Sequence, residues 1–351
     1  MPELVVAGAG MAGLVAAARA RELGAAVTVH EKGDRAGGSA LLSSGFVWRY
    51  RHWDTFRAQC PGGDPALQRL VWERLDDALA WLEGLGAPVR SRDTGNELTT
   101  GCGFEPVGLV EALTRRVVGD LRLGEPLRQL SSGIPVVLAT GGFQADRELV
   151  RRHITSEADA LLLRANPWSA GDGLRLGVEA GAGLSAGMHE FYGRNMAAVD
   201  RLPESKFIEW GQPYARFATV VNERGETYEA STWSEIDVAQ WTARQPGARA
   251  WYRVTQAVLG ERVRDRTVGD MVDAARKAGA AVEEHDGEIV VPVQAGITTT
   301  LGGLGIDERA RVADGVFAAG ADAGGISTGG WASGLASALV LGLVAAESAV
   351  A

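Results

Sequence analysis

The sequence predicts an α/β fold, in which a mostly parallel sheet with helices is interrupted by an inserted α+β domain. Three observations support this prediction. The chain opens with an apolar strand, a glycine-rich turn, a helix and a second strand, and residues 133–143 form a later apolar strand that ends in Thr-Gly-Gly. Residues 198–291 differ in character, with many charges and tryptophans. We therefore expect one domain from residues 1–197 and 292–351, and a second from residues 198–291.

The composition narrows the possible partners. The 351 residues suit two domains, and the net charge of −9 disfavours nucleic acid or an anionic membrane as the main partner. The 2 cysteines and 5 scattered histidines predict neither a disulfide framework nor a metal site. The first residues lack the positive segment of a signal peptide, so we expect a cytoplasmic protein.

The opening segment has the pattern of a dinucleotide-binding βαβ unit. Gly8, Gly10 and Gly13 have GxGxxG spacing, which allows a tight turn and lets backbone N–H groups approach a pyrophosphate at a helix N-terminus. Glu31 stands roughly 20 residues further on, where a carboxylate accepts hydrogen bonds from the adenosine ribose. The alternative is a tight strand–helix turn with no ligand. The expected elements are a strand at 4–7, a helix at 14–24 and a strand at 26–32.

The following elements are assigned from periodicity and glycine clusters. Residues 34–46 form a second Gly/Ser cluster, which either wraps a diphosphate or ring or is a plain surface loop. Apolar residues at i, i+3 and i+4 predict an amphipathic helix over 65–84. Further expected elements are helices at 106–119 and 169–182, a strand edge at 125–130, a polar and aromatic segment at 187–196, and a return to the first domain over 293–307 and 315–325.

The stretch "GGISTGGWASGLASALVLG", residues 324–342, has no charged residue. It could be a membrane anchor, a buried helix or the floor of a binding site. The glycines leave only residues 336–346 as apolar helix, whereas a membrane span needs roughly 20 residues. We therefore expect a buried helix in the second half, and a loop and helix N-terminus in the first.

Seven separated segments, taken in order, resemble the FAD-dependent flavoproteins of the fumarate reductase and 3-ketosteroid dehydrogenase superfamily. They are "VVAGAGMAGLVAAARARELGAAVTVHEK", "GGSALLSSG", "VVLATGGF", "GDGLRLGVEAGA", "TTTLGGLGID", "VFAAGADAGG" and "SALVLGLVAA". The resemblance implies a Rossmann-like FAD-binding domain made from both ends of the chain and a mobile capping domain, with a small-molecule substrate between the cap and the isoalloxazine ring. The "GGSALLS" segment has no histidine at the usual place of flavin attachment, so noncovalent FAD is expected.

The resemblance also implies a set of FAD contacts. They are Gly8, Gly10, Met11, Ala12 and Gly13 at the pyrophosphate; Glu31 and Lys32 at the ribose; Gly38, Ser39, Ser44 and Gly45 along the diphosphate and flavin; Leu127, as a strand residue, at adenine; Thr140 and Gly141 on the adenosine side; Asp172 in the GDG motif; Gly320 and Asp322 in "AAGAD", the latter at the ribityl chain; and the N–H groups of Ser333, Gly334 and Leu335 near N1 and O2 of the flavin. For Asp322 the alternative is a solvent-exposed turn residue.

Two positions depart from the reductase pattern. In an ungapped comparison over residues 221–237, Glu235 stands where the reductases carry a catalytic arginine, and Gly329 stands near a second arginine position. Loss of these cations removes a bidentate carboxylate clamp, so fumarate and succinate are not expected as substrates. Phe46, Trp48 and Trp331 instead suggest an apolar, aromatic-lined slot.

The implied chemistry is α,β-dehydrogenation beside a carbonyl, or the reverse ene-reduction, with hydride moving to or from flavin N5. Such chemistry needs a proton-transfer group such as a tyrosine with a lowered pKa. Tyr192 is the first candidate, followed by His189 and Arg194, with Tyr50 and Tyr252 as further candidates. Each could instead be structural: a packed ring, a bonded histidine or a surface cation. A flavin monooxygenase or oxidase and a non-catalytic FAD-binding protein remain alternatives, and the electron partner is not identified.

Overall fold

The computed structural model describes residues 1–229 and 234–351, and the chain divides into two units. Unit 1 comprises residues 1–146, 166–190 and 300–351; unit 2 comprises 147–165 and 191–299. Of the stretch 221–237 compared with the reductase motif, residues 230–233 lie outside the described residues. These units differ from the expected boundaries at 197/198 and 291/292. Residues 147–165 and both flanks of the expected insertion belong to unit 2, because their strands pair within its sheet.

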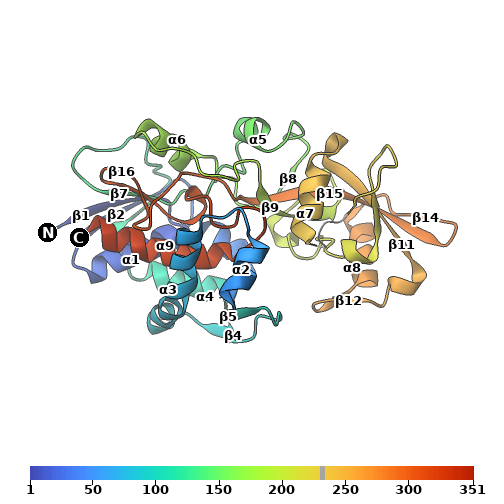
Figure 1. Ribbon diagram of the computed structural model, residues 1–351, viewed down its shortest axis with the longest axis horizontal. Coiled ribbons are helices and arrows are strands. Elements are labelled where there is room, and N and C mark those ends of the chain that lie inside the picture. Colours follow the sequence, from blue (N-terminus) through green and yellow to red (C-terminus); the bar gives the residue numbers. More distant parts are fainter. Residues whose placement is uncertain (230–233) are drawn as a thin grey trace. The chain divides into compact units, whose positions relative to one another are not determined.

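Unit 1 is built on a six-stranded sheet in the order β16-β17-β7-β1-β2-β6 (Figure 1). Its strands are β1 (Glu3–Ala7), β2 (Ala26–Glu31), β6 (Leu121–Leu123), β7 (Val136–Leu138), β16 (Arg311–Ala313) and β17 (Val316–Ala318). All neighbouring pairs are parallel except β16–β17. Strands from both ends of the chain thus share one sheet, since β17 pairs β7 and β7 pairs β1. The predicted α/β class with a Rossmann-like sheet is confirmed.

The helices of unit 1 place the glycine-rich turn and bury the C-terminal segment. They are α1 (Met11–Glu22), α2 (Trp53–Gln59), α3 (Pro65–Gly84), α4 (Pro106–Thr114), α6 (Asp172–Glu179) and α9 (Gly334–Ala349). Helices α1 and α9 pack side by side (Figure 1), and a Cβ on Gly342 would lie 2.7 Å from the Ala12 carbonyl oxygen. Gly342 therefore permits a close helix–helix approach. Helix α9 is buried from Ala336 to Ala346, as expected for the second half of the uncharged stretch. In the described part of the chain, no helix has the length and apolar character needed to cross a membrane.

A small antiparallel sheet, in the order β3-β5-β4, completes unit 1. Its strands are β3 (Phe46–Tyr50), β4 (Val89–Ser91) and β5 (Thr99–Phe104). Strand β3 directly follows the second Gly/Ser cluster, and its first residue, Phe46, accepts a hydrogen bond on its carbonyl from the Ser333 hydroxyl at 3.3 Å. The small sheet thereby holds the end of the glycine-rich segment against the start of α9.

Unit 2 is an α+β domain. Its strands are β8 (Leu162–Leu163), β9 (Phe191–Ala197), β10 (Thr219–Val221), β11 (Arg249–Thr255), β12 (Arg262–Val263), β13 (Arg266–Thr267), β14 (Glu283–His285) and β15 (Glu288–Thr300), and its helices are α5 (Arg147–His153), α7 (Glu235–Ala243) and α8 (Val268–Ala278). The main sheet has the order β10-β11-β15-β14, with β8 and β9 also paired to β15. In β11, Ala250, Tyr252 and Val254 are buried in the core with Met271 of α8, as the two-residue period of a strand requires.

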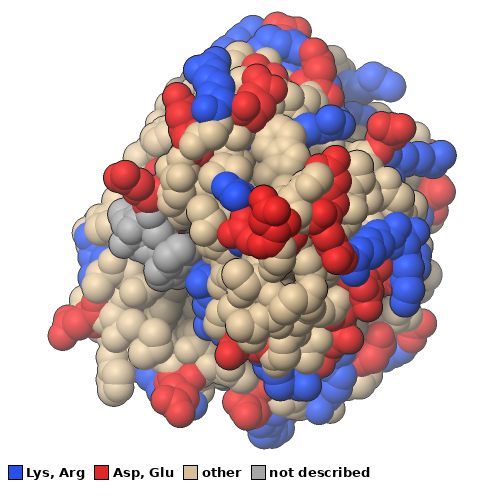
Figure 2. Space-filling model, turned by 90° about the vertical axis from the view of Figure 1, so that its right-hand side faces the viewer, with Lys and Arg blue, Asp and Glu red and all other residues tan. Residues whose placement is uncertain are grey.

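Charged side chains of both signs are interspersed on the face shown in Figure 2, which looks onto the end of unit 2 carrying β11 and β14. Acidic side chains gather near the centre of this view, in keeping with the net charge of −9. Over the described residues of this face there is no continuous basic surface of the kind that follows a nucleic-acid backbone.

Two expected elements are wrong in position. The strand edge expected at 125–130 lies at Leu121–Leu123, where the chain pairs with β2; Gly124 then adopts φ +72° and ends the strand. Leu127 is consequently not a strand residue. The helix expected over 106–119 ends at Thr114, and residues 118–120 form a separate 3-10 turn.

Candidate functional site

The glycines of the first turn are required for different reasons. Gly8 has φ +100°, and a Cβ there would lie 2.2 Å from the Ala139 carbonyl oxygen. A Cβ on Gly13 would lie 1.9 Å from the Gly8 carbonyl oxygen. Gly10 is different: its φ is −72°, which any residue adopts, and no atom lies within 4 Å of its Cβ position. Packing therefore explains Gly8 and Gly13 but not Gly10, and the open space beside Gly10 leaves its backbone accessible to a ligand.

The N-terminus of α1 begins at this open position. Gly10 is the N-cap, no side chain caps the helix among the described residues, and the first turn has no acidic residue. Met11 and Ala12 are only 4% and 5% exposed. A largely buried helix start with uncapped N–H groups and no negative charge suits the phosphates of a dinucleotide.

Glu31, at the end of β2, stabilises the glycine-rich turn by accepting backbone hydrogen bonds. One carboxylate oxygen accepts the Ala9 N–H at 2.7 Å and the other accepts the Gly33 N–H at 2.6 Å, with the side chain 7% exposed. Each carboxylate oxygen has a second lone pair, so these bonds leave acceptor capacity for ribose hydroxyls. The same side chain can hold the turn and bind a sugar.

The second Gly/Ser cluster lies against the first. The Gly37 N–H donates to the Ala9 carbonyl at 2.7 Å, and a Cβ on Gly38 would lie 3.2 Å from the Gly10 Cα. The Ser39 hydroxyl accepts a hydrogen bond from the Asn166 side chain at 2.8 Å. We use the term glycine cradle for Gly8, Gly10, Gly13, Gly37 and Gly38. The surface-loop alternative therefore does not describe this end of the cluster.

At its other end, the same cluster makes protein contacts. Gly45 has φ +74°, and a Cβ there would lie 2.2 Å from the Phe104 carbonyl oxygen. The Ser44 carbonyl accepts a hydrogen bond from Arg90 at 2.9 Å. Packing alone thus accounts for Gly45, so its glycine carries no information about a ligand.

Asp322 joins the C-terminal segment to the Thr-Gly-Gly turn after β7. Its carboxylate accepts hydrogen bonds from the Thr140 N–H and hydroxyl, and from the Gly142 N–H at 3.0 Å. Burial raises the pKa of this carboxyl, although these hydrogen bonds oppose the rise. The side chain is 1% exposed, so the alternative of a solvent-exposed turn residue is wrong. A Cβ on Gly173 would lie 2.2 Å from one of its oxygens, which explains the glycine of the GDG motif.

Lys32 and Asp172, both expected near the adenosine, form an ion pair with each other. The Lys32 Nζ lies 2.8 Å from the Asp172 carboxylate, which also pairs with Arg175 at 2.5 Å. These pairs join the end of β2 to the start of α6. The structure thus brings the two predicted residues together.

The loop before α9 is held by backbone constraints. Gly329 has φ +80° and donates its N–H to the Glu190 carboxylate at 2.8 Å. Ser333 is the N-cap of α9, and its hydroxyl accepts the Ala336 N–H at 3.2 Å. The left-handed backbone at Gly329 gives a physical reason why no arginine stands there. Gly334 and Leu335 begin α9, which packs on the turn at Gly320–Asp322, where a Cβ on Gly320 would lie 4.0 Å from the Ala338 Cβ.

The aromatic side chains of unit 1 that are expected near the substrate partly pack against one another. The Trp48 and Tyr50 rings meet edge to face with centroids 5.4 Å apart, and the Tyr50 phenol donates to the Trp331 carbonyl at 2.8 Å. Phe46 packs over Gly103, where a Cβ would lie 2.8 Å from its ring. Burial, and to a lesser degree Cys60, raises the pKa of Tyr50. Tyr50 is thus better suited to holding the loop than to transferring protons at neutral pH.

Unit 2 contains a group that we call the arginine–tyrosine cluster: Tyr192, Arg164, Arg194 and Arg264. Arg194 lies 5.2 Å from the Tyr192 ring centroid and hydrogen-bonds to its phenol. Burial opposes ionisation of the phenol, but Arg194, Arg164 and Arg264 outweigh it and hold the pKa of Tyr192 below its ordinary value. Arg164 is fixed by bonds to the Phe207 carbonyl at 3.1 Å and to the Thr298 hydroxyl at 3.0 Å.

Glu235 and Tyr252 lie in the interior of unit 2. Glu235 accepts the Ala215 N–H at 3.1 Å, and burial raises its pKa to about 7, against the influence of Arg194 and this hydrogen bond. Tyr252 is 0% exposed, its phenol accepts the Asn195 side-chain N–H at 3.0 Å, and burial raises its pKa well above the ordinary value. Tyr252 is therefore unsuited to proton exchange with a substrate.

The predicted proton-transfer residues fall into different settings. His189 is exposed and lies 3.6 Å from the Glu190 carboxylate in unit 1, whereas Tyr192 and Arg194 share one strand of unit 2. Sequence reasoning missed Arg164 and Arg264. The only local signal was a lone arginine after the apolar run of residues 161–163, and Arg264 stands in a hairpin with φ +59°. In the described ranges, no group of three or more His, Cys, Asp or Glu side chains could hold a metal ion.

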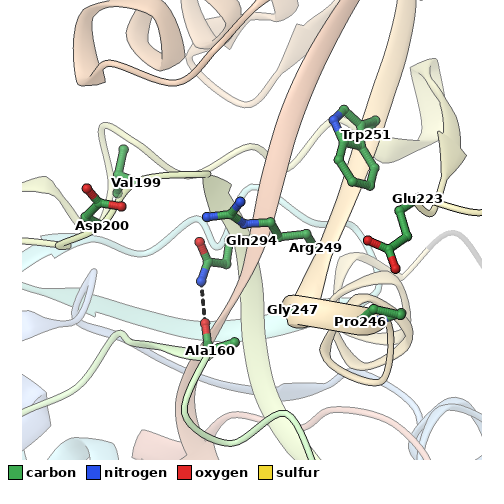
Figure 3. Close-up of a pocket in the computed structure, with 9 residues that line it drawn as sticks. All are labelled: Ala160, Val199, Asp200, Glu223, Pro246, Gly247, Arg249, Trp251 and Gln294. Atoms are coloured by element: carbon green, nitrogen blue, oxygen red, sulfur yellow. Dashed lines mark hydrogen bonds between the residues drawn. The ribbon is translucent and has the colours of Figure 1, made fainter.

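A separate cavity of about 510 Å³ also lies in unit 2. Figure 3 shows the Gln294 side chain, which donates to the Ala160 carbonyl, beside the extended side chain of Arg249, with Trp251 and Glu223 on the other side. Arg249 and Gln294 are directly opposite each other in the β11–β15 pair. The cavity shares no lining residue with the arginine–tyrosine cluster, and the sequence analysis assigned none of its residues to a site.

The glycine-rich turn, the Glu31 carboxylate and the N-terminus of α1 together define a dinucleotide-binding fold. A match to a known protein family identifies the dinucleotide. Residues 3–115 and 109–337 match the family described as FAD binding domain. The chain therefore belongs to the FAD binding domain family, and the resemblance noted from the seven segments is confirmed. The glycine cradle fits FAD, because Gly10 leaves an open approach to an uncapped helix N-terminus. By family the chain is an FAD-dependent oxidoreductase.

Known proteins similar to the chain span two kinds of enzyme. A probable fumarate reductase of Shewanella frigidimarina is 23% identical over 451 residues, covering 99% of this chain and 74% of the relative. The open conformation of a flavocytochrome c3 fumarate reductase has a TM-score of 0.74 at 21% identity, covering 99% of this chain and 78% of that one. A 3-ketosteroid-Δ4-(5α)-dehydrogenase of Rhodococcus jostii, solved with 4-androstene-3,17-dione, has a TM-score of 0.70 at 18% identity, covering 100% and 97%. At these identities the structures establish the fold.

Proposed function

We propose that the chain catalyses hydride transfer between noncovalently bound FAD and a carbon next to an activated C–C or C=C bond of a carbonyl compound. The reaction would be an α,β-dehydrogenation or the reverse ene-reduction. The observation that carries the proposal is the arginine–tyrosine cluster, which lowers the pKa of a half-buried tyrosine. Proton transfer of this kind is what bond formation or cleavage beside a carbonyl requires.

When bound, FAD supplies a hydride acceptor or donor at N5. In unit 1, the uncapped start of α1 would hold its pyrophosphate and Glu31 its ribose. Asp322 keeps the Thr140–Gly142 turn in place for the ribityl side. The N–H groups at the start of α9 would face negative charge at N1 and O2, in keeping with the partial positive charge of a helix N-terminus.

Tyr192 would transfer the proton. As a phenolate it would remove a proton from the carbon next to the carbonyl, and as a phenol it would return one in the reverse direction. Arg194 hydrogen-bonds to the phenol and, with Arg164 and Arg264, favours its ionised form. A proton-transfer group acts best when its pKa lies near the working pH, which is the direction of this shift.

We infer a largely apolar carbonyl substrate, distinct from fumarate and succinate. The support is the left-handed Gly329, where an arginine would be strained, together with Trp48 and Trp331 in unit 1. Two of the structures similar to this chain are ketosteroid dehydrogenases, solved with 4-androstene-3,17-dione and with 1,4-androstadiene-3,17-dione. These two ligands support a hydrophobic ketone as a class to test first.

A second candidate substrate carries a negative charge. Arg164, Arg194 and Arg264 gather in unit 2, and arginines bind carboxylates well. The relative described as a probable fumarate reductase agrees with this reading. In that case the cluster would bind an unsaturated carboxylate, and Tyr192 would still lie beside it.

Anaerobic flavin spectroscopy separates these possibilities. The purified holoprotein with oxidised flavin would be mixed separately with 4-androstene-3,17-dione, cyclohexanone, succinate and NADPH. After chemical reduction of its flavin, the holoprotein would be mixed separately with cyclohexenone and fumarate. The proposal predicts flavin reduction by a ketone or reoxidation by an enone. Reaction with succinate or fumarate alone supports the anionic substrate. NADPH reduction followed by a hydroperoxide intermediate in O₂ supports the monooxygenase, and a flavin that responds to none of these supports a non-catalytic FAD-binding protein.

A further inference from the structure

In the described part of unit 2, the buried polar atoms without a hydrogen-bond partner include a set of four. They are the Glu235 Oε2, the Tyr214 hydroxyl, the Asn195 Oδ1 and the Gln212 Oε1. The residues are linked, because the Gln212 N–H donates to the Asn195 carbonyl at 2.8 Å, and Tyr214 precedes Ala215, whose N–H binds Glu235. Buried polar atoms are nearly always bonded, so a group of unpartnered ones needs an explanation, such as a bound water or a functional role.

The group adjoins the arginine–tyrosine cluster through β9. Helix α7 packs on this strand: Gln240 donates to the Phe191 carbonyl at 3.0 Å, and Asn195 donates to the Thr242 hydroxyl at 2.8 Å. Asn195 immediately follows Arg194 and also bonds to Tyr252. The first residue of α7 is Glu235. One strand and one helix therefore hold both Tyr192 and the buried carboxyl.

The groups that act on Glu235 come from several elements. Arg194 of β9 and Arg216 of the 3-10 turn at Ala215–Phe217 favour its ionised form, and Tyr214, Tyr228 and Tyr252 also interact with it. Burial dominates and raises its pKa to about 7, so its charge changes near neutral pH. The groups acting on Tyr192 are Arg194, Arg164 and Arg264. Among the residues that the structure describes, Arg194 acts on both Glu235 and Tyr192.

We propose that Glu235 is a positioning residue that controls the ionisation of Tyr192 through Arg194. When Glu235 is neutral, the Arg194 charge is fully available to the phenolate of Tyr192. When Glu235 ionises, it attracts the Arg194 guanidinium towards itself and away from the phenol, so the phenolate is less favoured. The inference rests on the proposed role of Tyr192 in proton transfer, but its electrostatic content can be measured without any substrate.

The test is a titration of tyrosinate absorbance in the holoprotein, with Tyr192→Phe identifying the signal of Tyr192. In Glu235→Gln, the carboxylate charge is removed, so the pKa of Tyr192 should fall by about half a unit to one unit. Asp237→Asn is the matched control, since it removes a negative charge two residues along the same helix; it should leave the titration of Tyr192 within about 0.2 units. Circular dichroism and thermal unfolding would check that each variant is folded.

A double-mutant cycle tests the role of Arg194. Arg194→Met alone should raise the pKa of Tyr192, and adding Glu235→Gln to it should then change the titration little. An equal effect of Glu235→Gln with and without Arg194, or no effect in either background, would overturn the inference. If the coupling is present but Tyr192→Phe leaves turnover of every tested substrate unchanged, the inference stands and the proposed function fails.

Discussion

The glycine cradle of unit 1 and the arginine–tyrosine cluster of unit 2 are specified in different ways. The cradle is local: most of its residues lie within one strand–turn–helix unit, and its chemistry comes from backbone N–H groups. The cluster is assembled from side chains at residues 164, 192, 194 and 264, which β8, β9 and the β12–β13 hairpin bring together. A backbone site is readable from glycine spacing, whereas a side-chain site of this kind is readable only after folding.

The largest effect should come from changing the two kinds of glycine in the cradle. Gly13→Val places a side chain onto the Gly8 carbonyl, so we expect the protein to misfold or to lose several kcal/mol of unfolding free energy. Gly10→Val meets open space and an ordinary φ, so we expect a folded protein that binds FAD at least about 100-fold more weakly. Thermal unfolding of the apoprotein and FAD titration would measure both.

If Gly10→Val bound FAD normally, the open space beside Gly10 would not be the approach of the cofactor. Equal destabilisation by the two valines would contradict the distinction between packing and ligand access within the cradle.

Tyr192→Phe removes the proposed proton-transfer group and leaves the ring. We expect kcat to fall by about 10²- to 10⁴-fold, the usual contribution of a general acid or base, with FAD affinity unchanged. Steady-state kinetics with whichever ketone or enone reacts with the flavin would test this. Tyr50→Phe is a suitable control, because its phenol donates to a backbone carbonyl and lies in unit 1. Comparable losses of kcat in both variants would remove Tyr192 from its assigned role.

Glu235 should make stability depend on pH. Its carboxyl binds a proton more tightly in the folded protein, with a pKa of about 7 against an ordinary 4.5. Unfolding free energy should therefore decrease as pH rises from about 4.5 to 7 and then level off, by about 3 kcal/mol at most. Glu235→Gln should abolish this decrease. Urea unfolding at a series of pH values would show it, and an unchanged slope in the variant would mean that Glu235 ionises normally.

The smallest expected effect is that of Arg264, the residue of the arginine–tyrosine cluster that lies furthest along the chain from Tyr192. Arg264→Met should raise the pKa of Tyr192 by about half a unit, because one of three cations is lost. Arg262→Met, on the same hairpin, is the control and should have no effect on the titration. The measurement is again tyrosinate absorbance. A shift as large with Arg262→Met would mean that the overall charge of the hairpin matters, and not the position of Arg264.

The sequence was a good guide where structure depends on neighbours along the chain. The GxGxxG turn, Glu31 and the helix over 65–84 follow from spacing, and the structure has α3 over the same residues. The strand expected at 125–130 was wrong because register with β2 decided its place, and such pairing is not local. The domain boundaries differed for the same reason: residues 147–165 and the strands at 191–197 and 288–299 pair within the sheet of unit 2.

The sequence by itself determined the family, the α/β class and the cofactor-binding turn, because glycine conformation and hydrophobic period are properties of short segments. Only the tertiary structure showed that Asp322 is buried in the Thr140–Gly142 turn, and that Gly329 is left-handed. It alone brought Arg164 and Arg264 to Tyr192 and put Glu235 in the interior. Electrostatic interactions depend on distance and burial in space, and neither quantity is encoded in the spacing of residues along the chain.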